Sequence, residues 1–363
     1  MPVCQQPDML ISSEWESTIS QLLSEPGVTM VVGETDAGKT SFCAQLARAG
    51  FDAGVTTAVV DADVGQSEIG APGTIGMATV DKSIESLSEL KPRRLYFVGA
   101  TSPAGHMLEC AVGSKKLVDA ALNLGARLVV LDTTGLVTGH IGRKLKTYKA
   151  DLVRPAYIVG LQRKKEIEHL LIPFAKMESV KVLRVQSTEN ARVKPPELRA
   201  ARRQASFHRH FHDALGHIIR LDEVSLWNTW FCSGRPLKWQ YMKFIEDALG
   251  CRVLHAEVVT RGLFIVAEKA CRGGRLCLLQ EQFKTEDIKV VTADLLKDLL
   301  VGLADESANT LDVGLVQAVD FKQRFMFVLS HIRTVSPVRV VQFGALRVTK
   351  EGKELETLKP GVL

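Results

Sequence analysis

The stretch Val28-Thr29-Met30-Val31-Val32-Gly33-Glu34-Thr35-Asp36-Ala37-Gly38-Lys39-Thr40 decides the fold of this chain. Residues 28–32 form a short, largely apolar run rich in β-branched side chains, which predicts a buried strand. A glycine-rich loop follows at once, and Phe42, Leu46 and Ala49 then recur at the spacing of a helix over residues 40–49. Loops of this pattern bind phosphate when they follow a strand and open a helix.

The chemistry of such a loop depends on its backbone. Glycines let the N–H groups turn toward phosphate oxygens, and the positive end of the helix dipole adds to the attraction. Lys39 is expected to reach the β- and γ-phosphates, and the Thr40 hydroxyl to ligate Mg²⁺. The alternative is a glycine-rich turn without a ligand. We expect nucleotide binding by Gly33, Glu34, Thr35, Asp36, Ala37, Gly38, Lys39, Thr40 and Ser41.

The alternation of strand and helix continues along the first half of the chain. A second strand over residues 56–60 ends at Asp61 and completes a βαβ unit. Further strands are predicted over 95–98, 128–131, 156–160 and 180–185, and helices over 115–123 and 164–171. This order predicts an α/β fold, in which helices flank a parallel sheet on both faces.

The pattern of predicted secondary structure changes from about residue 221. Short strands are predicted over 263–267, 276–279, 315–319, 325–329, 338–343 and 345–348, with one amphipathic helix over 292–300. The second half therefore reads as a smaller, mainly β domain. We predict a short N-terminal extension (1–25), a P-loop domain with its lid (26–220) and the small domain (221–363).

Composition excludes several classes of protein. The 363 residues are 46% hydrophobic and 24% charged, which is typical of a soluble globular protein. No apolar stretch approaches the roughly 20 residues that span a bilayer, and residues 1–20 lack the pattern of a secretory signal, so we expect a cytoplasmic protein without membrane contact.

The seven cysteines are scattered without a CxxC pair, which favours reduced thiols over disulfides or zinc. The net charge of +5 permits a nucleic-acid partner.

Carboxylates stand at two predicted strand ends. Asp61 and Asp63 follow the second strand, and Asp132 ends the strand over 128–131. Ligands of open α/β sheets lie beyond these strand ends. One carboxylate there can hold Mg²⁺ and another can accept a proton from an attacking hydroxyl, although solvated turns are the simpler alternative. The sequence leaves open which aspartate belongs to the metal.

A basic segment follows the predicted sheet. It contains Arg192, Lys194, Arg199, Arg202, Arg203 and Arg209. Residues 199, 202 and 203 share one side of a helix. Such a helix can be a lid whose arginines stabilise transition-state charge, or simply a solvated basic surface.

Taken in order, these motifs resemble the P-loop polynucleotide 5′-hydroxyl kinases, a family that includes the kinase subunit of the eukaryotic pre-mRNA cleavage complex. The matching elements are Gly38-Lys39-Thr40, Asp61-x-Asp63-x-Gly65-Gln66 with Ile69 and Pro72-Gly73-Thr74, Thr133 and Gly135 before Gly139, and the arginines 199–203. The segments 299–303, 319–321 and 344–347 are similar to the family's small C-terminal domain. Two departures are Leu136, where some members have a base-stacking tryptophan, and the short N-terminal extension, which fits a compact prokaryote-type member.

The resemblance implies transfer of the γ-phosphate of ATP, with Mg²⁺, to the 5′-hydroxyl of RNA or DNA. It implies catalytic roles for Lys39, Asp61, Asp63, Arg199 and Arg203, with Arg202 as a further lid candidate, metal ligation by Thr40 and Asp63, and substrate contacts by Gln66, Thr133 and Gly135. Asp61 and Asp63 both remain candidates for the base. Two other functions stay open: an ATP-binding scaffold in nucleic-acid processing without turnover, and a nucleotide-hydrolysing switch. Protein partners are not predicted.

Overall fold

The computed structural model describes residues 13–187, 195–260, 262–271, 275–359 and 361–363. The chain divides into two compact units. The first contains Met1–Gly70, Ile75–Arg93 and Met107–Pro196, and the second contains Ala71–Thr74, Arg94–His106 and Glu197–Leu363. The predicted arginine helix thus groups with the C-terminal half, and the domain division at residue 220 stays a prediction.

The first unit is built on the sheet that the sequence predicts. Its parallel strands lie in the order β2 (Thr57–Ala62), β5 (Leu128–Thr133), β1 (Val28–Gly33), β6 (Tyr157–Gln162) and β7 (Lys181–Gln186). One strand was not predicted: β3 (Thr74–Thr79) runs antiparallel to β2, so the sheet is mixed. Gly76 weakens the strand pattern of β3, and it is needed there because a Cβ would overlap the Ile69 carbonyl.

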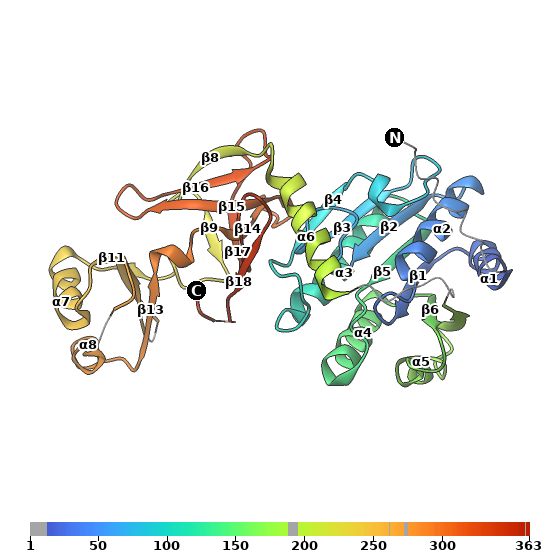
Figure 1. Ribbon diagram of the computed structural model, residues 1–363, viewed down its shortest axis with the longest axis horizontal. Coiled ribbons are helices and arrows are strands. Elements are labelled where there is room, and N and C mark those ends of the chain that lie inside the picture. The colour runs from blue at the N-terminus through green and yellow to red at the C-terminus, as the bar shows by residue number, and fades with distance from the viewer. Residues whose placement is uncertain (1–12, 188–194, 261, 272–274, 360) are drawn as a thin grey trace. The chain divides into compact units, whose positions relative to one another are not determined.

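Helices cover this sheet on both faces (Figure 1). α1 (Ser13–Ser24) and α2 (Lys39–Asp52) share one core, in which Trp15 packs edge-on against Phe42 and the side chains of Val159 and Leu161 point toward them. Gly160 faces the opposite way, toward Leu171. That face carries α3 (Met107–Asn123), α4 (Gly139–Val153) and α5 (Glu168–Phe174). The predicted α/β fold class is confirmed.

Four helices of the first unit differ from the prediction, and one of them, α3, begins at Met107 rather than at 115. α1 lies within the segment that the sequence left as an extension, and Trp15 Nε1 ties it to the carbonyl of Gln186 at 3.0 Å. α4 was not predicted. α5 begins at Glu168 rather than at 164, because the Glu166 carboxylate accepts the backbone N–H groups of Arg163 and Lys164 and holds that segment as a turn.

The second unit is mainly β, as predicted. Its larger sheet contains β4 (Arg94–Phe97), β8 (Leu215–Arg220), β9 (Ser225–Trp227), β14 (Leu299–Ala304), β15 (Thr310–Asp320), β16 (Phe325–Ser330), β17 (Val340–Val348) and β18 (Glu354–Thr357), and α6 (Pro196–Phe211) packs against it. A smaller sheet contains β10 (Arg235–Pro236), β11 (Val253–Val259), β12 (Gly262–Ala267) and β13 (Asp287–Thr292), with α7 (Trp239–Leu249) and α8 (Leu276–Phe283).

Three predictions for this half were wrong. Residues 276–279 begin the helix α8 rather than a strand, since a short apolar run has no period that separates the two. The predicted helix over 292–300 is a single 3₁₀ turn (Ala293–Leu295) followed by β14, whose residues are all buried. The two segments 338–343 and 345–348 form one strand, β17, which continues through Gly344.

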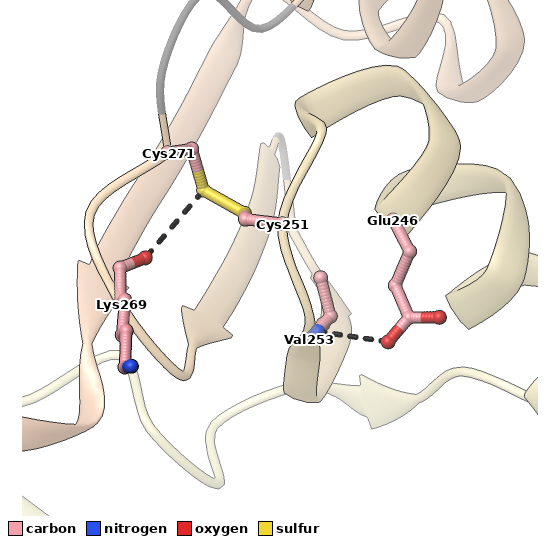
Figure 2. Close-up of a disulfide and its surroundings, with 5 residues drawn as sticks. All are labelled: Glu246, Cys251, Val253, Lys269 and Cys271. Carbon is pink, nitrogen blue, oxygen red and sulfur yellow. Dashed lines mark hydrogen bonds between the residues drawn. A yellow bond between two sulfur atoms is a disulfide. The ribbon is translucent and has the colours of Figure 1, made fainter.

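A disulfide corrects the expectation of reduced thiols. Cys251, just after α7, is bonded to Cys271, which follows β12 (Figure 2). Beside it, the Glu246 carboxylate accepts the Val253 N–H at 3.0 Å. Cys43, Cys110, Cys232 and Cys277 are free, and Cys4 lies outside the described residues. No helix in the described part of the chain has the length and apolar character to cross a bilayer.

Candidate functional site at the phosphate loop

The phosphate loop lies between β1 and α2, as predicted. Two of its residues adopt left-handed backbone conformations, Asp36 with φ 58° and Gly38 with φ 88°. At Gly33 a Cβ would stand 2.7 Å from the Leu161 carbonyl oxygen, so only glycine fits there. The sequence around the loop thus meets the steric demands of a nucleotide-binding P-loop.

Neighbouring strands hold this loop in place. The Arg163 guanidinium, just after β6, donates to the Asp36 carbonyl at 2.8 Å and lies 3.8 Å from the Glu34 carboxylate. The Ser187 hydroxyl, after β7, donates to the Ala37 carbonyl at 2.8 Å. Sequence reasoning missed both residues, because each acts from a strand distant in sequence and neither belongs to a motif.

The side chain of Lys39 extends back over the phosphate loop. It is buried, and Nζ donates to the Glu34 carbonyl at 2.8 Å. This ammonium therefore lies above the loop backbone, where a phosphate oxygen can replace the carbonyl as its acceptor.

The Thr40 hydroxyl points at a strand-end carboxylate. It donates to Oδ2 of Asp132 at 2.7 Å. The other oxygen of this carboxylate, Oδ1, is buried and has no hydrogen-bond partner among the described residues. Burial raises the pKa of Asp132 to about 6, opposed by the charge of Lys39. Asp132, the competing candidate for the metal-related role, is thus the aspartate that contacts Thr40. Metal ligation by Thr40 and Asp63 stays a prediction.

Asp61 lies beside Asp132, because the two residues are register partners on β2 and β5. Its carboxylate accepts backbone N–H groups from Asp63, Glu68 and Ile69 at 3.0, 2.6 and 3.1 Å, and the Ser67 hydroxyl at 3.3 Å. Burial, reinforced by the charge of Asp132, raises the pKa of Asp61 to about 8. Both oxygens of Asp61 thus accept hydrogen bonds from the loop that follows β2. Its expected catalytic role stays a prediction.

Asp63 is more accessible than Asp61. It is half-buried, and its Oδ1 accepts the N–H groups of Gly65 and Gln66 at 3.1 and 3.2 Å. The Gln66 amide donates to the Gly65 carbonyl at 2.7 Å. Asp63 and Gln66, both predicted site residues, therefore lie in one tight turn at the carboxyl end of β2.

The loop between β5 and α4 touches the phosphate loop. A Cβ on Gly135 would overlap the Thr35 hydroxyl and stand 2.6 Å from the Thr35 nitrogen, so Gly135 permits this close approach. Thr133 is fully buried, and its hydroxyl donates to the Val31 carbonyl at 2.7 Å and accepts from Lys146 at 2.9 Å. Its predicted contact with a substrate stays a prediction.

Two buried lysines were missed by the sequence reasoning. Lys146 and Lys149 lie three residues apart on the inner face of α4, with 1% and 0% of their surface exposed. Lys146 Nζ also donates to the Thr134 carbonyl at 2.5 Å, and burial lowers the pKa of both lysines. The helical period of Gly142, Leu145 and Val153 offered a signal, but lysines are expected on the outer face of a helix.

The arginine helix α6 is anchored by its C-terminal half. Phe207 and Phe211 are fully buried in the core of the second unit. Arg203 makes a two-point ion pair with Glu354 of β18, at 2.6 and 3.2 Å, whereas Arg199 is half-exposed and Arg202 exposed. Arg209 is exposed, and the other two basic residues of the predicted segment, Arg192 and Lys194, lie outside the described residues.

Comparisons with known proteins show which proteins this chain is similar to. The family model described as the mRNA cleavage and polyadenylation factor CLP1 P-loop matches residues 33–213. The chain is 33% identical to the polyribonucleotide 5′-hydroxyl-kinase of Thermococcus kodakarensis and 30% identical to that of Pyrococcus furiosus, in each case over 93% of this chain and 92% of the relative. The solved structure of a Clp1p–Pcf11p complex is similar in fold, with a TM-score of 0.60 at 12% identity, covering 91% of this chain and 77% of that one.

Proposed function

Since the chain belongs to the CLP1 P-loop family, we propose that it is a polynucleotide kinase that transfers the γ-phosphate of ATP to the 5′-hydroxyl end of RNA or DNA. The observation that carries this proposal is the contact of the Thr40 hydroxyl with Asp132 beside a pre-shaped phosphate loop. The archaeal relatives are named polyribonucleotide kinases, which favours RNA as the acceptor.

Binding of the triphosphate falls to the phosphate loop. Its backbone N–H groups and the N-terminus of α2 attract the phosphate oxygens. Lys39 exchanges the Glu34 carbonyl, now 2.8 Å from its Nζ, for the β- and γ-phosphates. Gly135 lets the neighbouring loop close against Thr35, so the γ-phosphate is enclosed from that side.

Thr40 and Asp132 would hold Mg²⁺. The Oδ1 oxygen of Asp132, buried and without a partner in the described part of the chain, fits a hard cation that prefers oxygen ligands. When bound, the cation neutralises charge on the phosphates during transfer. We assign this position to Asp132 rather than to Asp63, because only Asp132 contacts the Thr40 hydroxyl.

We assign the proton acceptor to Asp63. The 5′-hydroxyl oxygen forms a bond to the γ-phosphorus, the bond from that phosphorus to the β–γ bridging oxygen breaks, and ADP leaves. The hydroxyl proton passes to the Asp63 carboxylate. Partial exposure supports this choice over Asp61, which is 1% exposed and already accepts four hydrogen bonds. Gln66, in the same turn, would orient the acceptor end.

The arginines of α6 would neutralise the charge on the transferring phosphoryl group. Arg199 is the first candidate, with Arg202 beside it on the helix. Arg203 would have to leave Glu354 before it could take part.

A transfer assay tests the proposal. Incubation with γ-labelled ATP, Mg²⁺ and matched 5′-hydroxyl RNA and DNA oligonucleotides should label the 5′ end, with RNA favoured. Lys39→Ala should abolish the label, whereas Lys144→Ala, on the exposed face of α4, should leave it unchanged. Tight ATP retention by the wild-type protein without label transfer would instead favour the scaffold function, and hydrolysis without an acceptor would favour the switch.

A further inference from the structure

The segment 224–245 of the second unit combines aromatic and basic residues without an acidic one. It holds three of the chain's four tryptophans, and each of these three is exposed. The exposed fractions are 44% for Trp227, 36% for Trp230 and 74% for Trp239. Aromatic side chains among basic ones are typical of surfaces that bind single-stranded nucleic acid.

The most exposed of these rings lies on a firmly packed helix, α7. The inner face of α7 is buried through Ile245, Ala248 and Leu249, in a core shared with β11, β12 and α8. The Cys251–Cys271 disulfide joins the segment after α7 to the segment after β12 (Figure 2). The outer face of α7 is therefore a fixed surface.

Two aromatic rings share this outer face with two polar side chains. Lys243 lies one turn after Trp239, and Phe244, which is 36% exposed, lies one turn after Gln240. Residues one turn apart are neighbours on a helix, so the four exposed side chains form one patch. Neither ring of this patch packs against another ring or a cation within the described residues. Both rings are thus available to stack on a base.

The charges around the patch favour an anionic partner. Arg235 of β10 and Lys238, which directly precedes α7, are exposed, as is Lys243. None of these three side chains forms an ion pair in the described part of the chain. The acidic residues of α7, Glu246 and Asp247, come only in the second half of the helix.

We propose that the outer face of α7 is a second binding surface for the single-stranded acceptor, distinct from the phosphate-loop site. Trp239 and Phe244 stack on bases, and Lys243 between them contacts a phosphate. A protein groove fits this face less well, because a helix that docks in such a groove repeats apolar residues one turn apart, whereas Lys243 follows Trp239. The inference rests on the proposed function for the nature of the acceptor.

RNA binding without transfer tests the proposal. The probe is a fluorescent oligouridylate of about 20 nucleotides, longer than one such surface covers. Its 5′ end carries a phosphate, so it cannot be phosphorylated there. Trp239→Leu keeps an apolar side chain but removes the ring, and it should weaken binding by at least about fivefold in fluorescence anisotropy. Trp239→Phe keeps a ring and should restore most of the affinity.

Salt dependence tests the charge separately from the rings. Lys243→Gln should lower the slope of log Kd against log salt concentration by about 0.7, the value for one phosphate contact on a single strand. Trp239→Leu should leave that slope unchanged. Lys176→Gln, in the exposed segment between α5 and β7, is the matched control and should keep both the wild-type affinity and the wild-type slope. Because all these side chains are exposed, each variant should melt at the wild-type Tm.

Unchanged RNA affinity in Trp239→Leu, or equal losses in Trp239→Leu and Trp239→Phe, would overturn the proposal. A wild-type dimer that Trp239→Leu converts into a monomer, with unchanged RNA affinity, would assign the face to a second copy of the chain instead. If Trp239→Leu does not fold, the slope of Lys243→Gln decides, and a wild-type slope refutes the phosphate contact. These measurements need neither ATP nor turnover. Binding through α7 without labelling of 5′-hydroxyl ends would refute only the proposed function.

Discussion

Thr40 and Asp132 stand 92 positions apart in the chain, yet the threonine hydroxyl donates a 2.7 Å hydrogen bond to the aspartate carboxylate. The contact joins the start of α2 to the end of β5. It follows from the register of the parallel sheet, which brings β1 and β5 side by side and sets their carboxyl ends at one edge.

Asp132→Asn should weaken metal binding and transfer together. The amide still accepts from Thr40, but it removes the charge from the Oδ1 position that has no partner among the described residues. We expect a loss of about 10–100-fold in Mn²⁺ affinity, with a parallel loss in kcat. Asp151→Asn, on the exposed face of α4, is the control. Wild-type Mn²⁺ affinity in Asp132→Asn would remove Asp132 from the metal site.

Substitutions of Asp61, near the end of β2, and of Asp63, just after it, should have different effects. Asp63→Asn should lower kcat by about 10²–10⁴-fold with little change in Tm, since it removes the proton acceptor. Asp61→Asn should mainly lower stability, by about 1–3 kcal/mol, because an amide cannot accept all the donors around Asp61. Steady-state kinetics and urea unfolding of both variants make the comparison, and the reverse pattern would exchange their roles.

Stability should depend on pH through Asp61. Its pKa is about 8 in the folded protein against a usual value of 3.8, so the folded state binds this proton more tightly than the unfolded state does. The resulting stabilisation is complete below pH 3.8 and is lost as the pH rises to about 8. Urea unfolding in EDTA at pH 5 and pH 8 should therefore show a steeper fall for wild type than for Asp61→Asn. Parallel curves would contradict the raised pKa.

Gly135→Ala should damage nucleotide binding. The new methyl group would overlap Thr35 and press on the backbone of the phosphate loop. We expect at least about a tenfold loss of ATP affinity, equivalent to roughly 1.4 kcal/mol. Gly139→Ala is the control, since it has a positive φ but open space around it and so tests backbone strain alone. Equal calorimetric affinities for the two variants would show that the close approach at Gly135 is not required.

Glu354→Gln should free Arg203. The ion pair is partly exposed, so its loss should cost no more than about 1 kcal/mol of stability. If Arg203 acts on the phosphates, Glu354→Gln should retain or raise kcat while Arg203→Ala lowers it. If both variants lose activity equally, Arg203 serves only to fasten α6 to β18.

The sequence predicted what depends on local pattern. Each of these patterns lies within a few residues. The run 28–32 identified a strand, the glycines identified the phosphate loop, and the apolar run into Asp132 identified the position of a carboxylate. It did not predict what depends on register. The pairing of Asp61 with Asp132 and the burial of Thr133 follow from strand neighbours far away in the chain.

Buried charge was equally hidden from the sequence. In the sequence, Lys146 and Lys149 look like solvent-exposed residues, but both are buried on the inner face of α4. In the second unit, the short apolar run 276–279 has no period that separates a strand from the helix α8. The segment 292–300 has a helical pattern, yet its end belongs to the fully buried strand β14.

The ties from Arg163 and Ser187 to the phosphate loop have a consequence for binding kinetics. Because the carbonyls of Asp36 and Ala37 are already fixed by strands β6 and β7, the loop has little conformational entropy left to lose when a triphosphate enters. Association should then be a single fast step without a slow rearrangement of the loop. Differences in affinity between nucleotides would appear in how quickly each one leaves.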